Sequence, residues 1–251
     1  MMRLLLLVID LLLCVSQGLC QQPDPEIETV FEEKVAVWKT WVNEHTNSSD
    51  LTSCKEFKDI VALGPKVVPL LIKKIQEDKS NFLFTSAIES ITQVRIPKEK
   101  WPEGRMGGSI SAVNVYQIWW HEDRKNTEQT YHALKSQWDE LKASPDIERT
   151  EIGLPLLWYD QTVYDARSGS LLVFGRPHIT ELGRVYISVE GLGIDILPLI
   201  IIDLANKRYD FLSIFMRMTQ FHVDRAKNIG DQADDILAWW NIHKEEWMMP
   251  E

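Results

Sequence analysis

Six histidines and three cysteines are the side chains that could hold a metal or act as nucleophiles in this 251-residue sequence. The histidines are scattered along the chain, at His45, His121, His132, His178, His222 and His243. No two of them stand four residues apart with a glutamate in the zinc-protease arrangement, and no Cys/His cluster is present. The sequence therefore predicts neither a metal site nor a cofactor.

Other motifs of catalysis are incomplete. Ser168-Gly169-Ser170 lacks the Gly-x-Ser-x-Gly pattern of a nucleophile elbow. The glycine-rich stretch from Gly104 to Gly108 could cradle an anion ahead of a helix, but it lacks the Lys-Ser/Thr of a phosphate loop, so a plain connection is favoured. The neighbouring carboxylates Asp234 and Asp235 point apart on a helix. We expect no catalytic residues and no enzyme activity.

The ten tryptophans allow two interpretations. Exposed aromatic rings could stack on sugars and form a glycan-binding face. The alternative is that they fill the helical core, which their placement favours because most lie on apolar stripes or at equivalent repeat positions. These core candidates are Trp38, Trp41, Trp119, Trp138, Trp239 and Trp240.

Charge and targeting signals suggest the cellular compartment. The net charge of −10 argues against nucleic acid as the partner. Residues 1–20 resemble a cleaved signal peptide, with Arg3 ahead of a short apolar run. We expect a secreted or periplasmic protein without a membrane span in the mature chain; a retained membrane anchor, or a lipid anchor at Cys20, is the alternative. Cys54 then remains as a buried, inert thiol, and no intrachain disulfide forms.

Apolar residues recur at helical spacing along most of the remaining sequence. In the first helix the expected buried stripe is Val30, Val37, Trp38 and Trp41, and Ser53 with Glu56 suggests a capping box for the second helix. A strand is possible instead of a helix at Val185 and Ile187. The expected helices span residues 26–45, 53–63, 65–77, 109–123, 128–143, 179–192, 194–205, 208–221 and 231–246. A further helix follows the break at 78–80 and carries Phe84, Ala87, Ile88 and Ile91 on its apolar face.

Residues 151–175 interrupt the helical pattern. Two apolar runs flank the turn cluster Asp165–Ser170, which predicts a small β-hairpin or an ordered loop. Long loops carry function more often than packed helices do. We therefore take Trp158, Tyr159, Tyr164 and Arg167, residue types enriched at interfaces, as candidate binding residues. The alternative is that Trp158 and Phe174 only fix the insertion to the helices.

A sequence pattern occurs twice. Leu63-Gly64, four residues and Pro69-Leu70 match Leu192-Gly193, four residues and Pro198-Leu199. A phenylalanine-bearing helix and a Trp-Trp helix follow in both copies, and a Trp-bearing helix precedes both. We expect a first unit over residues 24–123 and a second over residues 128–248, and the 151–175 insertion lies in the second.

Pairs of helices joined by a Leu-Gly … Pro-Leu corner resemble HEAT and armadillo repeats. The corner and the final Trp239-Trp240 … Lys244 … Trp247 helix are also similar to a group of secreted bacterial HEAT-like proteins without an assigned function. The resemblance implies an all-α fold of the α-α superhelix type, with two related HEAT-like multi-helix units. It implies no catalytic residues.

The expected function is therefore a non-enzymatic extracytoplasmic module that mediates protein–protein interaction or scaffolding. A module that binds glycans or peptides through exposed aromatic residues is the alternative. An accessory domain of a secreted hydrolase is the third possibility.

Overall fold

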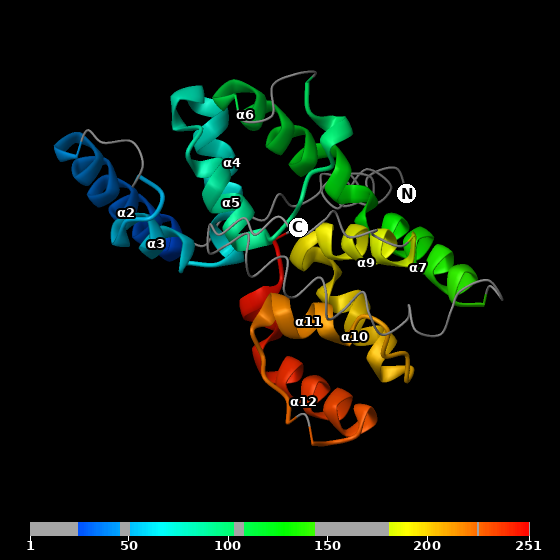
Figure 1. Cartoon of the computed structure of the whole chain (residues 1–251). Helices are drawn as coiled ribbons and strands as arrows, with labels where there is room; N and C mark the ends of the chain where they lie inside the picture. Colours follow the sequence, from blue (N-terminus) through cyan, green and yellow to red (C-terminus); the bar gives the residue numbers. More distant parts are fainter. Residues whose placement is uncertain (1–24, 46–50, 103–107, 144–180, 225, 251) are drawn as a thin grey trace, which may run out of the picture.

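The computed structural model describes residues 25–45, 51–102, 108–143, 181–224 and 226–250, and every regular element in these ranges is a helix (Figure 1). This confirms the all-α fold class. The α-helices are α2 (Pro25–Glu44), α3 (Lys55–Val61), α4 (Val68–Glu77), α5 (Phe84–Thr92), α6 (Ser109–Ile118), α7 (Thr127–Ala143), α9 (Glu181–Gly191), α10 (Leu197–Ala205), α11 (Leu212–Thr219) and α12 (Ile229–Trp247). The shorter elements are the 3-10 turns η2 (Pro65–Val67), η3 (Lys79–Asn81), η4 (Lys98–Lys100), η6 (Arg124–Asn126) and η7 (Gly193–Ile196), and the π-helical turn η5 (Trp119–Asp123).

Several predictions fall on residues outside the described ranges. These are the signal peptide at 1–20, the fate of Cys20, and the 151–175 insertion with its candidate binding residues Trp158, Tyr159, Tyr164 and Arg167. The division into units 24–123 and 128–248 stays a prediction. Below, residues 25–126 are called the first half and residues 127–250 the second half.

The same order of elements occurs in each half. In the first half α2, α3, η2, α4, α5 and α6 follow one another, and in the second α7, α9, η7, α10, α11 and α12 do. The corner between the second and third of these helices has a positive-φ glycine in both copies, Gly64 at φ 73° and Gly193 at φ 75°. A proline then stands in the first turn of the next helix, Pro69 in α4 and Pro198 in α10, where a missing amide costs little.

The ends of α5 and α11 also match. Each helix stops at a glutamine in the left-handed region, Gln93 at φ 55°, ψ 17° and Gln220 at φ 55°, ψ 20°. The preceding threonine donates its hydroxyl to the carbonyl four residues back and accepts a bond from the amide two residues on. This side chain closes the helix end, because it occupies backbone groups that the helix leaves without a partner.

Aromatic rings fill the centre of each half in a corresponding way. In the first half Trp38 of α2 contacts Phe57 and Phe84, with ring centroids 5.4 and 5.2 Å apart. In the second half Trp138 of α7 contacts Tyr186 and Phe211, at 6.0 and 5.4 Å. All six rings are buried and belong to one core that runs through both halves. Burying such rings supplies a large share of the apolar surface that drives folding.

Three sequence expectations are corrected. In α2 the buried residues are Phe31, Val35 and Trp38, whereas Val37 is exposed, because the faces of α3 and α5 select a different stripe from the predicted one. The cap of α3 is Cys54, not Ser53, and its sulfur accepts a bond from the Phe57 amide at 3.4 Å. Cys54 is partly buried in this position.

Two further local details differ from the expectation. Val185 and Ile187 lie in helix α9, so the alternative of a strand is wrong. The Trp-Trp pairs are not used alike: Trp119 is buried and Trp120 half-buried, whereas Trp240 is buried and Trp239 half-buried. The first pair opens the π-helical turn η5, whereas Trp239 and Trp240 lie inside the regular helix α12.

The two halves meet reciprocally, each corner against the end of a helix from the other half. At the second corner, Gly193 lies so close to the end of α5 that an added Cβ atom would be 2.4 Å from the Thr92 carbonyl oxygen. At the first corner, a Cβ atom on Gly64 would lie 4.0 Å from the Glu246 carbonyl oxygen at the end of α12. Gln93 also donates its side-chain amide to the Met218 carbonyl at 2.8 Å. These contacts tie the halves to each other.

Among the described helices, no single one combines the length and the apolar character needed to cross a membrane. Helices α9 and α10 with η7 reach that length and composition only as a pair, and the pair is bent by 102°.

Candidate functional site

The tryptophans of the described residues are packed rather than displayed. Trp38, Trp119, Trp138 and Trp240 are buried, which confirms the core interpretation for these four. The others in the described ranges, Trp41, Trp101, Trp120, Trp239 and Trp247, are partly buried and none is fully exposed. Two of them have a ring face covered by a histidine: His45 stacks on Trp41 with centroids 4.3 Å apart, and His243 on Trp239 at 4.7 Å. The four buried tryptophans are therefore not available to stack on a sugar.

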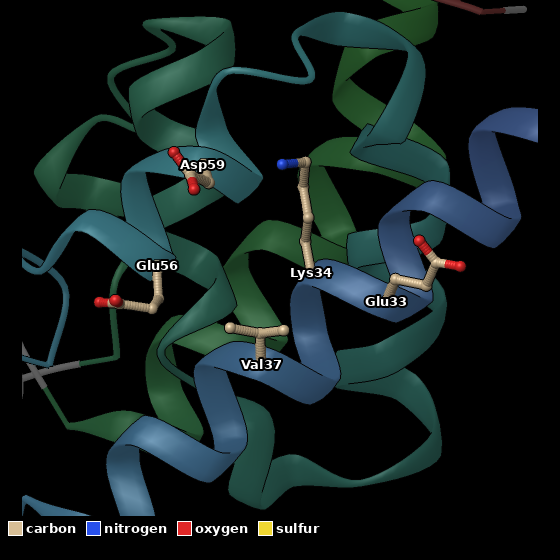
Figure 2. Close-up of a pocket in the computed structure, with 5 residues that line it drawn as sticks. All are labelled: Glu33, Lys34, Val37, Glu56 and Asp59. Atoms are coloured by element: carbon tan, nitrogen blue, oxygen red, sulfur yellow. The ribbon is translucent and has the colours of Figure 1, made fainter.

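A shallow groove of about 200 Å³ lies between α2 and α3 and is our candidate site (Figure 2). Val37 and Lys34 project from α2 into it, with Glu33 on one side and Glu56 and Asp59 of α3 on the other. Val37 is 59% exposed and is the apolar part of the groove. The groove therefore combines an accessible aliphatic side chain with three carboxylates and one amine.

Helical periodicity explains why these residues line the groove. Lys34 and Val37 are three residues apart on α2, as are Glu56 and Asp59 on α3, so each pair lies on one side of its helix. The intervening residues Val35 and Phe57 turn inward and are buried. Packing of the two helices thus leaves the charged sides facing each other across the opening.

The carboxylates on the two faces of α2 differ in their partners. Glu28 and Glu32 pair with lysines of α4, Lys73 at 3.7 Å and Lys74 at 2.8 Å. On the groove side, Glu33 and Glu56 make no ion pair with any residue that the structure describes, and Asp59 pairs only with the exposed Lys55, at 3.7 Å. The groove therefore carries carboxylate charge that local ion pairs leave largely uncompensated.

The second half provides an internal comparison. Equivalent positions of α2 and α7 are 100 residues apart, as Trp38 and Trp138 are. Equivalent positions of α3 and α9 are 129 residues apart. Neutral side chains stand where the groove has its acids: Ala133 for Glu33, Val185 for Glu56 and Ser188 for Asp59. The common architecture does not require these acids, which marks the groove as a feature of the first half alone.

A buried polar cluster distinguishes the second half. Asp203 of α10 accepts a bond from the Tyr131 hydroxyl at 2.7 Å and one from the Lys135 ammonium, and Arg208 stands 3.9 Å away. Tyr131, Lys135 and Asp203 are all buried. Burial, and then the hydrogen bond to Asp203, raises the pKa of Tyr131 above its usual range. The hydroxyl is therefore a stable neutral donor, and the polar groups of this cluster satisfy one another.

Two further carboxylates lie at the junction of the halves. Asp195 of η7 is held by the Arg124 guanidinium, whose Nε is 3.1 and 3.2 Å from its two oxygens, and Arg124 also stacks on Trp120 at 4.6 Å. Burial raises the pKa of Asp195, and Arg124 opposes that effect. The other carboxylate, Glu190, lies between Arg95 at 3.5 Å and Arg217 at 3.0 Å. Both arrangements are structural links between segments.

Sequence reasoning did not identify the groove or the buried cluster. The position of Lys135 is the one sequence signal of the buried cluster. It lies on the apolar face of α7, four residues after Tyr131 and three before Trp138, where a charged side chain needs a buried partner. Its partner is 68 residues further along the chain and could not be assigned from spacing. In the described ranges no group of three His, Cys, Asp or Glu side chains is arranged to hold a metal ion.

Comparison with protein-family models, with curated proteins and with solved structures gives no match for this chain.

Proposed function

We propose that this chain is a non-enzymatic, extracytoplasmic module with two related HEAT-like units, and that it binds another protein. The groove between α2 and α3 is its docking surface for a positively charged, partly aliphatic segment of that protein. The observation that carries this proposal is the acidic border around the exposed Val37, in which Glu33 and Glu56 have no ion-pair partner among the described residues.

The chemistry of the groove specifies the complementary segment. An aliphatic side chain placed on Val37 removes apolar surface from water, which is favourable in proportion to the area covered. Lysine or arginine residues on either side of it reach Glu33 on one border and Glu56 with Asp59 on the other. Such an arrangement gives specificity and fast association through complementary charge.

Lys34 adds a discriminating element. Its amine occupies the same opening as the three carboxylates, so a purely basic segment meets one repulsive contact. An alternating basic and aliphatic segment avoids this contact by setting its aliphatic residue beside Val37 and Lys34. Repulsion of unsuitable partners is a common source of specificity at interfaces.

A peptide titration tests the proposal. A fluorescein-labelled Lys-Leu-Lys-Leu-Lys peptide is titrated with the full chain at low salt, and binding is followed by fluorescence anisotropy. Neutralising the border with Glu33→Gln, Glu56→Gln and Asp59→Asn removes three charges, each contributing about 0.3–1 kcal/mol at an exposed site. We therefore expect affinity to fall roughly 5- to 150-fold.

The matched control changes net charge equally but leaves the groove intact. Asp139→Asn, Glu140→Gln and Asp234→Asn neutralise three exposed carboxylates of the second half. This control should bind within about twofold of the wild type, after allowance for screening of distant charges. Equal losses in the two triple variants would show that the peptide senses only net charge, and the groove would not be a docking surface.

A further inference from the structure

The first helices of the two halves are similar enough to be interchangeable in shape. The buried side chains of α2 are Phe31, Val35 and Trp38. Those of α7 include Tyr131, Lys135 and Trp138, at the same spacing of four and three residues. Each tryptophan contacts two buried aromatic rings, Phe57 and Phe84 for Trp38 and Tyr186 and Phe211 for Trp138, at similar ring distances. The spacing of the buried residues alone therefore does not determine on which half α2 or α7 packs.

The ion pairs of the first helix distinguish the halves, because acid and base stand in opposite places in the two. In the first half the acids stand on the first helix and the bases on the third: Glu28 and Glu32 of α2 pair with Lys73 and Lys74 of α4. Of these pairs, Lys74 with Glu32 is the shorter, at 2.8 Å, and Lys74 is partly buried.

In the second half the base stands on the first helix and the acid on the third. Lys135 of α7 pairs with Asp203 of α10, and both side chains are buried. A second pair has the same direction, because Lys142 of α7 binds Asp210, which precedes α11. Asp203 in α10 is equivalent to Lys74 in α4, which lies 129 residues earlier. The residues three positions before them, Ile200 and Leu71, are 129 residues apart as well and are both buried.

An exchange of first helices would bring like charges together. Helix α7 on the first half would set Lys135 against Lys74, and its buried ammonium would lose its only described carboxylate. Helix α2 on the second half would set Glu32 towards Asp203, whose oxygens would lose both Tyr131 and Lys135. A buried charge without its partner is strongly unfavourable, so both exchanged states are penalised.

We infer that these oppositely directed ion pairs form a pairing code, in which each first helix is accepted by its own half and rejected by the other. The code prevents the α2 and α7 helices of two chains from exchanging places during folding. Exchange of equivalent elements is a known hazard of repeated sequences, and charge placement is a known means of excluding it.

Stability alone does not explain the cluster. The equivalent inward positions of α2 are the apolar Phe31 and Val35, so the fold accommodates apolar residues there. A buried ion pair is commonly no more stabilising than well-packed apolar residues of similar volume. Rejection of the wrong half is the property that the apolar alternative lacks.

Reversal of the charges separates the two explanations. The double variant Lys135→Glu, Asp203→Lys keeps an ion pair in the second half but gives it the same direction as the first half. Full-length wild type and variant are refolded from urea over about a hundredfold range of protein concentration. Size-exclusion chromatography with light scattering then gives the mass distribution, and circular dichroism checks the helix content. We expect the variant to give about tenfold more exchanged dimer than the wild type.

A second set of variants covers the case in which reversal of a buried pair impairs folding. Glu28→Lys, Glu32→Lys, Lys73→Glu and Lys74→Glu reverse the more exposed pairs of the first half and should also increase exchange. When both halves are reversed together the directions again differ, and the mass distribution should return to that of the wild type.

Arg124→Met with Asp195→Leu is the control, because it removes an ion pair of similar burial that does not involve α2 or α7. It should leave the dimer fraction unchanged. If reversal of the first half alone leaves the mass distribution as in the wild type, or if reversal of both halves fails to restore it, the pairing code does not exist.

Discussion

Substitution of Gly193 by alanine tests the reciprocal junction of the halves most directly. Gly193 has φ 75°, and a Cβ atom there would lie 2.4 Å from the Thr92 carbonyl oxygen and 2.9 Å from the Val94 amide nitrogen. Both neighbours are backbone atoms at the end of α5, so no side chain can turn aside to make room. The first half must move away from the second corner.

The size of the effect can be divided into two parts. A non-glycine residue held at positive φ costs about 1–3 kcal/mol. Forcing an extra carbon into a closely packed contact typically costs a further ~1–3 kcal/mol. We therefore expect Gly193→Ala to lower the free energy of unfolding by about 2–6 kcal/mol.

Gly64→Ala is the matched control. Gly64 has nearly the same φ, 73°, but its nearest neighbour to an added Cβ atom is 4.0 Å away. It should show only the conformational cost, about 1–3 kcal/mol for a region that glycine alone adopts readily. Urea denaturation followed by far-ultraviolet circular dichroism measures both variants. If Gly193→Ala costs no more than Gly64→Ala, the close approach of the second corner to α5 is refuted.

Two further outcomes follow from single side chains. Cys54→Ser replaces a weak sulfur acceptor at the cap of α3 by a preferred oxygen, so urea denaturation should show a gain of about 0.5–1 kcal/mol, whereas Cys54→Ala should show none. Burial raises the folded-state pKa of Asp195, so folding favours its protonated form. The stability that this residue contributes is therefore present at low pH and is lost as the pH rises through the folded-state pKa. The free energy of unfolding of Asp195→Asn, relative to that of the wild type, should therefore increase between about pH 3.9 and the raised pKa, and a flat or falling difference would contradict this assignment.

The positions of most helices could be predicted because their signals are local. The expected helix at 65–77 corresponds to η2 and α4, and its predicted buried residues Val67, Leu70, Leu71 and Ile75 are all buried. Glycine at a corner and proline in the following turn act through backbone geometry within a few residues. Such signals can be read without knowledge of the rest of the chain.

The direction in which a helix faces could not always be predicted. Helix α2 offers two apolar stripes, one through Val37 and Trp41 and one through Phe31 and Val35. Both have helical spacing, so periodicity could not choose between them. Contact with Phe57 and Phe84 through Trp38 decides the matter, and it leaves Val37 exposed in the groove.

The sequence by itself determined an all-α chain in which one pattern of corner and helices occurs twice, because hydrophobic period, capping and glycine or proline positions are encoded by neighbouring residues. Only the tertiary structure decided the reciprocal meeting of the halves, the groove and the opposite direction of their ion pairs. Lys135 and Asp203 are 68 residues apart, and Gln93 and Met218 are 125 apart. Such contacts depend on how whole helices pack, and packing selects partners that no local pattern specifies.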